Sequence, residues 1–166
     1  MARFNTVVES PTALTTGINS ASGTTGGLFA CLNLSAAGTA RMRRLTFGVR
    51  AGTGAPTSQQ VSIAAIRSSA RGTQTTTATP NQLDPNSTTS LMRVDSAWST
   101  TPTLAGTALA NYSFEVSFNT QSGVDLPWEL LEELWIQGAN NGLAFFNVGN
   151  ALPTSHLYTA SFEWEE

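Results

Sequence analysis

The amino-acid sequence predicts an all-β fold: an antiparallel β-sandwich of about eight strands, with jelly-roll-like topology. Apolar and polar residues alternate over several short runs, as in strands with one buried face. Segments rich in Thr, Ser, Gly, Ala and Pro separate these runs. No stretch keeps a helical apolar period long enough to compete. Eight short antiparallel strands with irregular connections are typical of a jelly roll.

One β-sandwich domain is expected over residues 27–166, preceded by an N-terminal arm and polar loop, residues 1–26. A chain of 166 residues is long enough to bury a core and short enough for a single domain. The first nine residues carry Phe4, Val7 and Val8, so they could form a short strand or an extended arm. Pro, Gly, Ser and Thr dominate the rest of this segment and indicate loop.

The first half of the domain contains three good strand candidates. Residues 27–34 (GLFACLNL) are nearly all apolar, which favours a fully buried strand. Residues 43–51 alternate and predict a half-buried strand with a polar outer face. Residues 59–67 also alternate, but their phase shifts at Ala64 and Ala65, which indicates a β-bulge.

A long polar segment, residues 68–89, follows and is interpreted as a loop that is functional or mobile. Residues 89–95 predict a short strand. Residues 111–119 (NYSFEVSFN) give the cleanest alternation in the chain and predict another strand.

The densest part of the core is expected in the last quarter of the chain. Asn140-Asn141-Gly142 lies between two apolar runs, and Asn-Gly is the strongest short-range signal of a hairpin turn. We therefore expect Leu134–Ala139 and Leu143–Val148 to pair as a hairpin, with His156–Glu165 as a closing strand.

The run Pro127–Ile136 is open to two interpretations. Its large apolar residues fit helical spacing, and its proline could occupy the first turn of a helix. Alternatively, residues 128–139 form two strand pieces joined across Glu132 and Glu133. We favour the strands, because a helix here would have to end abruptly against a strong strand.

Charge and composition argue against nucleic acid and membrane as partners. Charged residues make up 11% of the chain, against ~25% in typical soluble domains, and the net charge is −3. All basic residues are arginines, and their one cluster is Arg41, Arg43 and Arg44. Adjacent residues of a strand face opposite sides, so this cluster makes a poor nucleic-acid patch. No apolar run is long enough to cross a bilayer, and the N-terminus lacks the apolar segment of a signal peptide. Synthesis in a cytoplasm, without export by the usual route, is expected.

No motif predicts catalysis, a cofactor or a metal, so the protein is not expected to be an enzyme. Cys31 lies in an apolar run and is interpreted as a buried inert thiol. His156, the single histidine, is expected to be a solvated residue where a strand begins. Asp84 and Asn86 give only a weak loop Ca²⁺ signal. The remaining acidic groups are interpreted as solvated carboxylates rather than a glycosidase pair; they are Glu129, Glu132, Glu133, Glu163, Glu165 and Glu166.

The role of the tryptophan side chains is open to two interpretations. Trp98 or Trp128 could stack on a sugar ring, as in a lectin. Trp128, Trp135 and Trp164 could equally be core or subunit-interface residues, because aromatic side chains dominate both settings.

The C-terminal sequence LWIQGANNGLAFFNVGNALPTSHLYTASFEWEE resembles the small jelly-roll decoration (cement) proteins of tailed bacteriophages. The likeness rests on an LWIQ strand, a turn, GLAFFNV, and a closing strand of alternating aromatics that ends in glutamates. It covers about the last third of the chain. The resemblance implies a structural protein of the virion, located on the outer capsid surface. It also implies a homotrimer that binds the major capsid protein and stabilises the shell.

Closed cyclic symmetry would let every copy use the same contact surface. We expect the N-terminal arm to reach a neighbour or the shell, and an apolar C-terminal surface to form the subunit contact. The alternative is a trimeric receptor- or carbohydrate-binding module of a phage tail or fibre. The expected contact residues are Phe4, Val7, Val8, Trp128, Trp135, Phe145 and Phe146.

Overall fold

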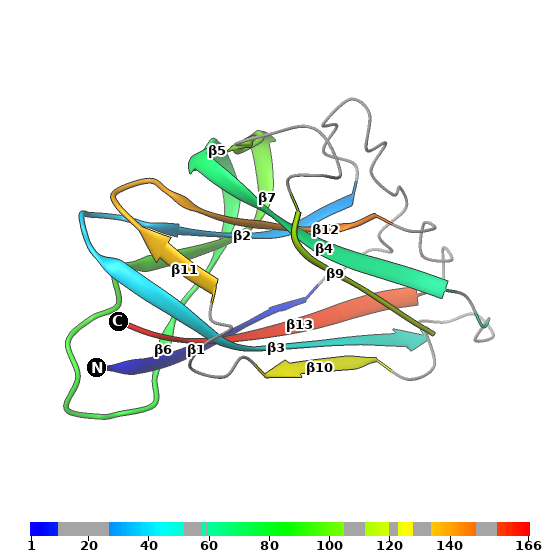
Figure 1. Ribbon diagram of the computed structural model, residues 1–166, viewed down its shortest axis with the longest axis horizontal. Helices are drawn as coiled ribbons and strands as arrows, with labels where there is room; N and C mark the ends of the chain where they lie inside the picture. Colours follow the sequence, from blue (N-terminus) through cyan, green and yellow to red (C-terminus); the bar gives the residue numbers. More distant parts are fainter. Residues whose placement is uncertain are drawn as a thin grey trace.

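The computed structural model is an all-β sandwich, as the sequence predicts. Two antiparallel sheets, A and B, pack face to face (Figure 1). Strands account for nearly all of the secondary structure of the described residues. The jelly-roll connectivity stays a prediction. The structure describes residues 1–9, 27–51, 58, 60–104, 112–119, 123–127, 134–148 and 156–166.

Sheet A has the order β10-β3-β13-β1-β6, and β11 also pairs with β3. Its centre is β13, whose residues alternate between buried and partly exposed along the whole strand. The bounds of β13 confirm the predicted closing strand. The strands of sheet A are β1 (Arg3–Glu9), β3 (Thr39–Ala51), β6 (Asn81–Gln82), β10 (Val124–Pro127), β11 (Leu134–Gln137) and β13 (His156–Glu165).

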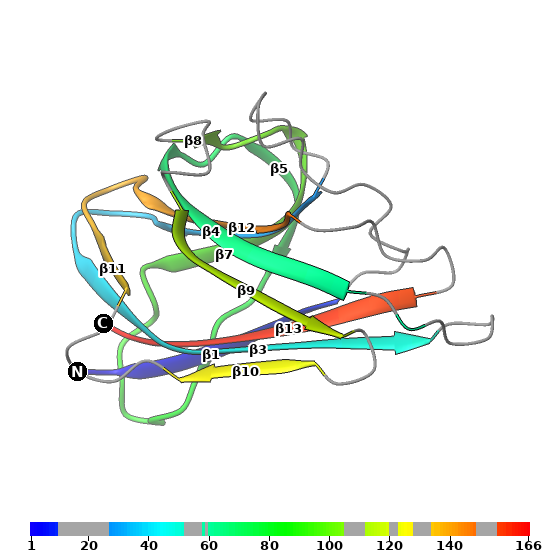
Figure 2. The same ribbon diagram turned by 45° about the vertical axis from the view of Figure 1, so that its right-hand side comes forward.

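Sheet B has the order β5-β7-β2-β12-β4-β8, and β9 also pairs with β4. The sheet curls strongly, so that β5, β7, β12, β4 and β8 surround a common space (Figure 2). Its strands are β2 (Leu28–Leu34), β4 (Gln60–Ala70), β5 (Thr73–Ala78), β7 (Met92–Thr100), β8 (Thr103–Leu104), β9 (Tyr112–Asn119) and β12 (Gly142–Asn147).

The main core lies between the two sheets and is rich in aromatic rings. Phe29 of β2 contacts Phe47 of β3 edge-on at 5.0 Å between ring centroids, and Tyr158 of β13 at 5.4 Å. Phe145 of β12 lies 4.9 Å from Phe162 of β13. These contacts join strands that are far apart in sequence, and such aromatic pairs add to the free energy of apolar burial.

A second apolar cluster lies on the other face of sheet B, inside its curl. The central strands of sheet B are therefore covered on both faces, which explains why every residue of β2 and of β12 is buried. The nearly continuous apolar run in residues 27–34 reflects this double burial. The cluster contains Leu28, Cys31, Ile66, Ala144 and Phe146, with Trp98, Leu104 and Val148 packed against it.

Residues 3–9 form β1 inside sheet A, which confirms the short-strand alternative for this segment and corrects the extended arm. β1 pairs with β13 along its whole length. Phe4 is buried and stacks on Trp164, with 5.9 Å between ring centroids. Phe4, Thr6 and Val8 face the core, whereas the residues between them are exposed or partly exposed. Burial of this inner face stabilises β1 in sheet A. Residues 10–26 lie outside the described residues.

The predicted hairpin is also wrong, because β11 and β12 belong to different sheets. β11 pairs with β3, whereas β12 pairs with β2 and β4. The chain crosses between sheets through a tight turn at residues 138–141, in which Asn140 has φ 65° and Gly138 has φ 88°. Asn-Gly therefore marks a turn, as predicted, but sheet pairing is decided by which faces of β11 and β12 must be buried.

Residues 68–89, interpreted as a polar loop, contain β5 and β6. β5 is rich in threonine, and it pairs with β7 at the edge of sheet B. The predicted bulge is confirmed, since the register between β4 and β9 shifts between Ala65 and Ile66. β11 pairs with β3 and confirms a strand that begins at Leu134, whereas the earlier of the two expected strand pieces stays a prediction. Residues 128–133 lie outside the described part of the chain.

Candidate interaction surface

Four of the five exposed large apolar side chains of the described residues lie at one end of the sandwich. Met1 is 80% exposed, Leu83 47%, Leu91 36% and Trp135 46%. A fifth, Val7, is 46% exposed and lies within β1 of sheet A. We call Met1, Leu83, Leu91 and Trp135 the end surface. Exposed apolar side chains that gather together mark interaction sites more often than isolated ones do.

Backbone hydrogen bonds bring the segments of the end surface together. Ala2 and Glu166 exchange backbone bonds of 2.9 and 3.0 Å, which places the N- and C-terminal residues side by side. The Leu83 amide donates to the Arg3 carbonyl at 2.9 Å. Both chain ends, β6 and β11 therefore lie at the same end of the molecule, on the left in Figure 1.

The Glu166 carboxylate fastens the segment that carries Leu91. Its Oε2 accepts the Leu91 amide at 2.7 Å, and its Oε1 accepts the Met92 amide at 3.0 Å and the Ser90 hydroxyl at 2.6 Å. Oε1 also accepts the Trp164 indole N–H at 2.8 Å, which fixes the carboxylate against the core. Bonds to an ionised acceptor are stronger than neutral ones, so this segment is held firmly.

Trp135 presents its ring beside an arginine. The Arg41 guanidinium carbon lies 4.9 Å from the centroid of the Trp135 ring, within the range of a cation–π contact. Arg41 is buried, and its Nη2 also contacts the sulfur of Met1. Trp and Arg are the residues most enriched at the energetic centres of protein interfaces.

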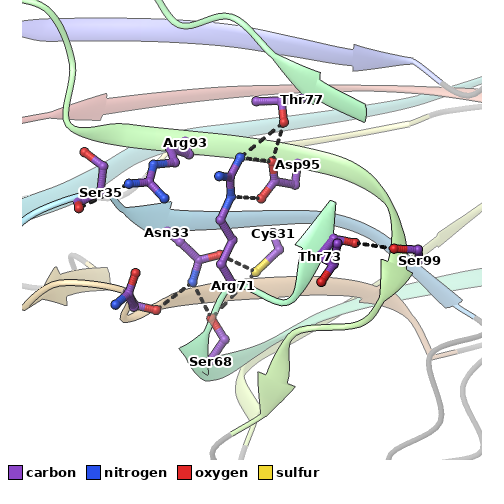
Figure 3. Close-up of polar contacts among 11 residues, drawn as sticks. Cys31, Asn33, Ser35, Ser68, Arg71, Thr73, Thr77, Arg93, Asp95 and Ser99 are labelled. Atoms are coloured by element: carbon purple, nitrogen blue, oxygen red, sulfur yellow. Dashed lines mark hydrogen bonds and ion pairs between the residues drawn. The ribbon is translucent and has the colours of Figure 1, made fainter. Parts of the chain in front are cut away.

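Inside the curl of sheet B, a polar network joins β2, β4 and the turn that precedes β12 (Figure 3). The Cys31 thiol donates to Asn33 Oδ1 at 3.0 Å, and Asn33 Nδ2 donates to Ser68 Oγ at 2.9 Å and to the Asn140 carbonyl at 3.0 Å. Burial raises the pKa of Cys31 to about 12. Cys31 is therefore a buried thiol that donates a hydrogen bond, in agreement with the buried position expected for it.

An ion pair between Arg71 and the buried Asp95 forms a second group of polar contacts. Arg71 donates from Nε and Nη2 to the two oxygens of Asp95, each at 2.7 Å. The Thr77 hydroxyl donates to the same carboxylate at 2.7 Å. Arg71 lies just before β5, and Thr77 lies within β5. Both contact Asp95 of β7, so these contacts fasten β5 to β7.

Several titratable residues lie where the sequence did not predict them. His156 is buried, not solvated, because the first residue of β13 already faces inward. Glu165 pairs with Arg43 at 2.7 Å, which holds the pKa of the Glu165 carboxyl below its usual range. Asp84 Oδ1 accepts the Asn86 amide at 3.0 Å and so caps its own turn.

Among the described residues, no group of three or more metal-binding side chains comes together.

The expected contact residues divide into two sets. Phe4, Val8, Phe145 and Phe146 are buried within the chain, so their expected place on a contact surface is corrected. Val7 and Trp135 are exposed, and Trp128 lies outside the described residues. Sequence reasoning missed Met1, Leu83 and Leu91. Leu83 and Leu91 could have been noticed in the sequence, because each is a large apolar residue among polar neighbours.

Trp98, the other proposed sugar platform, is partly buried against the second cluster. Its indole Nε1 is buried and has no hydrogen-bond partner among the described residues. The Trp98 ring therefore packs against the second apolar cluster, inside the curl of sheet B.

No protein-family model matches the chain, and no curated protein matches it. The part of the chain that the structure describes contains no helix that is long and apolar enough to cross a membrane.

Proposed function

We propose that this protein is a structural protein of a virus particle, a decoration protein that attaches to the outer surface of a phage capsid. The end surface is the attachment site, and the bound form is a homotrimer. Such a protein binds the major capsid protein at symmetry points of the shell and ties neighbouring capsomers together. Repetition of one contact by every copy multiplies a modest interaction over the whole shell.

The end surface is the observation that carries this proposal. It combines exposed apolar side chains with an arginine–tryptophan contact, and Glu166 keeps the segment that carries Leu91 in place. A preorganised surface loses little conformational entropy on binding, which favours attachment to a large rigid partner. The low content of charged residues adds little electrostatic repulsion between copies packed side by side.

Co-sedimentation with purified capsids and, separately, with tail tips tests the proposal. Wild-type protein is expected to pellet with capsids, and the double variant Leu83→Gln, Leu91→Gln is expected to bind more weakly. Full burial of a leucine is worth ~1.5–3 kcal/mol. Both side chains are partly covered already, so about 1 kcal/mol each, or roughly 30-fold in affinity together, is the expected loss.

Val7→Gln is the matched control. Val7 is as exposed as Leu83 and Trp135 but lies on β1, so this variant should bind capsids normally. Thermal melting checks that all variants fold. Unchanged capsid binding by the double variant, or loss of binding by Val7→Gln, would refute the end surface as the attachment site. Pelleting with tail tips and not with capsids would instead favour the receptor-binding alternative.

Light scattering after size exclusion measures the mass in solution. A stable homotrimer would give about three times the 17.5 kDa of one chain. A trimer whose mass falls in the Leu83→Gln, Leu91→Gln variant would place the same side chains at the contact between subunits.

A further inference from the structure

A groove lies between β11 of sheet A and strands β4 and β12 of sheet B, and it shares Trp135 with the end surface. Its volume is ≈ 440 Å³, which is within the range of small-molecule sites. β4, β11 and the start of β12 form its walls. The lining residues are Arg67, Ser68, Ser69, Trp135, Ile136, Gln137, Asn141 and Gly142.

Arg67 is the charged group of this groove. Its Nη1 donates to the carbonyl of Trp135, which ties a side chain of sheet B to the backbone of sheet A. Within the described residues, no carboxylate forms an ion pair with Arg67, whereas Arg43, Arg44 and Arg71 each have one. Partial burial without a nearby negative charge lowers the pKa of Arg67. The groove therefore holds a positive charge that an anionic ligand would neutralise.

The remaining lining groups combine a few polar atoms with apolar surface. Asn141 donates one N–H to the Gln137 carbonyl at 2.7 Å, so its side-chain oxygen and second N–H stay available. The exposed residues Ser69 and Gln137 add a hydroxyl and an amide. Trp135, which is exposed, supplies the apolar part. Amides and a hydroxyl can both donate to and accept from the hydroxyl groups of a ligand.

We propose that this groove binds a sugar residue that carries a carboxylate, with Arg67 holding the carboxylate. The planar guanidinium matches a carboxylate in a two-point contact. Phosphate sites usually recruit several cations or a helix N-terminus, whereas Arg67 is the one cation among the described residues that line this groove. Asn141, Gln137 and Ser69 face the ring hydroxyls, and Trp135 covers an apolar face of the ring. This inference goes beyond capsid attachment and does not depend on it.

Nuclear magnetic resonance titration of the ¹⁵N-labelled full chain tests the site, with glucuronate as the probe and glucose as its uncharged counterpart. Glucuronate is expected to shift the Trp135 indole and Arg67 Nε signals saturably, with a dissociation constant on the order of 1 mM. Glucose is expected to bind at least about tenfold more weakly, because it lacks the charge-assisted contact. Arg67→Gln should weaken glucuronate binding by a similar factor.

Arg93→Gln is the matched control, because it removes the same charge from β7 at a residue that does not line the groove. It should bind glucuronate as the wild type does. Equal binding of glucose and glucuronate, or unchanged binding by Arg67→Gln, would overturn the role of Arg67. Acetate binding as tight as glucuronate would overturn recognition of a sugar. The double variant Leu83→Gln, Leu91→Gln changes no lining residue of the groove and should bind glucuronate as the wild type does, so a failure of either proposal is seen separately.

Discussion

The ion pair between Arg71 and Asp95 allows a sharp test of how the curl of sheet B is stabilised. The Asp95 side chain is 0% exposed and that of Arg71 is 17% exposed. Figure 3 shows the Arg71 side chain extending past Asn33 and Cys31 toward Asp95. Replacing Arg71 with methionine keeps most of its volume but leaves a buried carboxylate with Thr77 as its remaining partner. Breaking a buried pair in this way costs ~3–5 kcal/mol.

The partial exposure of Arg71 places the expected loss near the lower limit, about 3 kcal/mol, which lowers the melting temperature by roughly 6–12 °C for a domain of this size. Urea unfolding and calorimetry measure both quantities. The double variant Arg71→Met, Asp95→Leu should recover much of the loss, because replacing both ions with apolar groups removes the desolvation penalty.

The pair between Arg44 and Asp125 is the control, because it is also a two-point contact but its side chains are 48% and 46% exposed. Solvent screens such a pair strongly, so Arg44→Met should leave the melting temperature almost unchanged. Equal losses in Arg71→Met and Arg44→Met would refute the argument that burial sets the importance of the first pair.

Three further outcomes are expected. In Gly142→Ala, the new Cβ would lie 2.1 Å from a backbone carbonyl oxygen, so urea unfolding should show a loss of unfolding free energy of ~3 kcal/mol or more. Gly48→Ala should be tolerated, because a Cβ there meets nothing within 4 Å. Equal losses of unfolding free energy in the two variants would contradict this account. The thiol of Cys31, with its pKa of about 12, should resist a disulfide reagent at pH 8 until urea unfolds the chain; fast labelling of the native protein would show that the curl opens. Arg43 lowers the pKa of Glu165, so the stability that this pair adds is present above the unfolded pKa of ~4.3 and is lost as pH falls through the lower folded value. Arg43→Gln should reduce this acid sensitivity, measured as unfolding free energy at pH 6 and pH 3.5.

Strand positions could be predicted where one face of a strand meets the core. β13 alternates along its whole length, because one face packs on the core and the other meets solvent or charged partners. The same physical cause made β3 and β4 recognisable. β2 was recognisable for a different reason, since both of its faces are buried and its sequence is apolar throughout.

Pairing between strands could not be predicted from local signals. The Asn140 turn shows the reason: its positive φ is a local property, whereas the partner of β12 is chosen by burial on both faces. β5 escaped recognition because its sequence, TQTTTA, has no large apolar residue. It is ordered by pairing with β7 and by the contact of Arg71 with Asp95, and both depend on residues distant in sequence.

The end surface and the groove could not be predicted for a related reason. Met1, Leu83, Leu91 and Trp135 are scattered along the chain, and only the arrangement of the sheets brings them to one end. Aromatic content drew attention to Phe145 and Phe146, but these residues fill the two faces of β12. Exposure, not residue type, distinguishes a contact residue from a core residue.

The placement of the few charges connects the fold to both proposals. Arg3, Arg43, Arg44 and Arg71 are each paired with a carboxylate of the same chain. Such pairing leaves little net field around these strands, so a large partner would be held mainly by apolar contact at the end surface, which salt affects little. The groove differs, because Arg67 has no carboxylate partner among the described residues, and salt would weaken its binding of an anion. One protein can thus carry two binding sites whose driving forces are physically distinct.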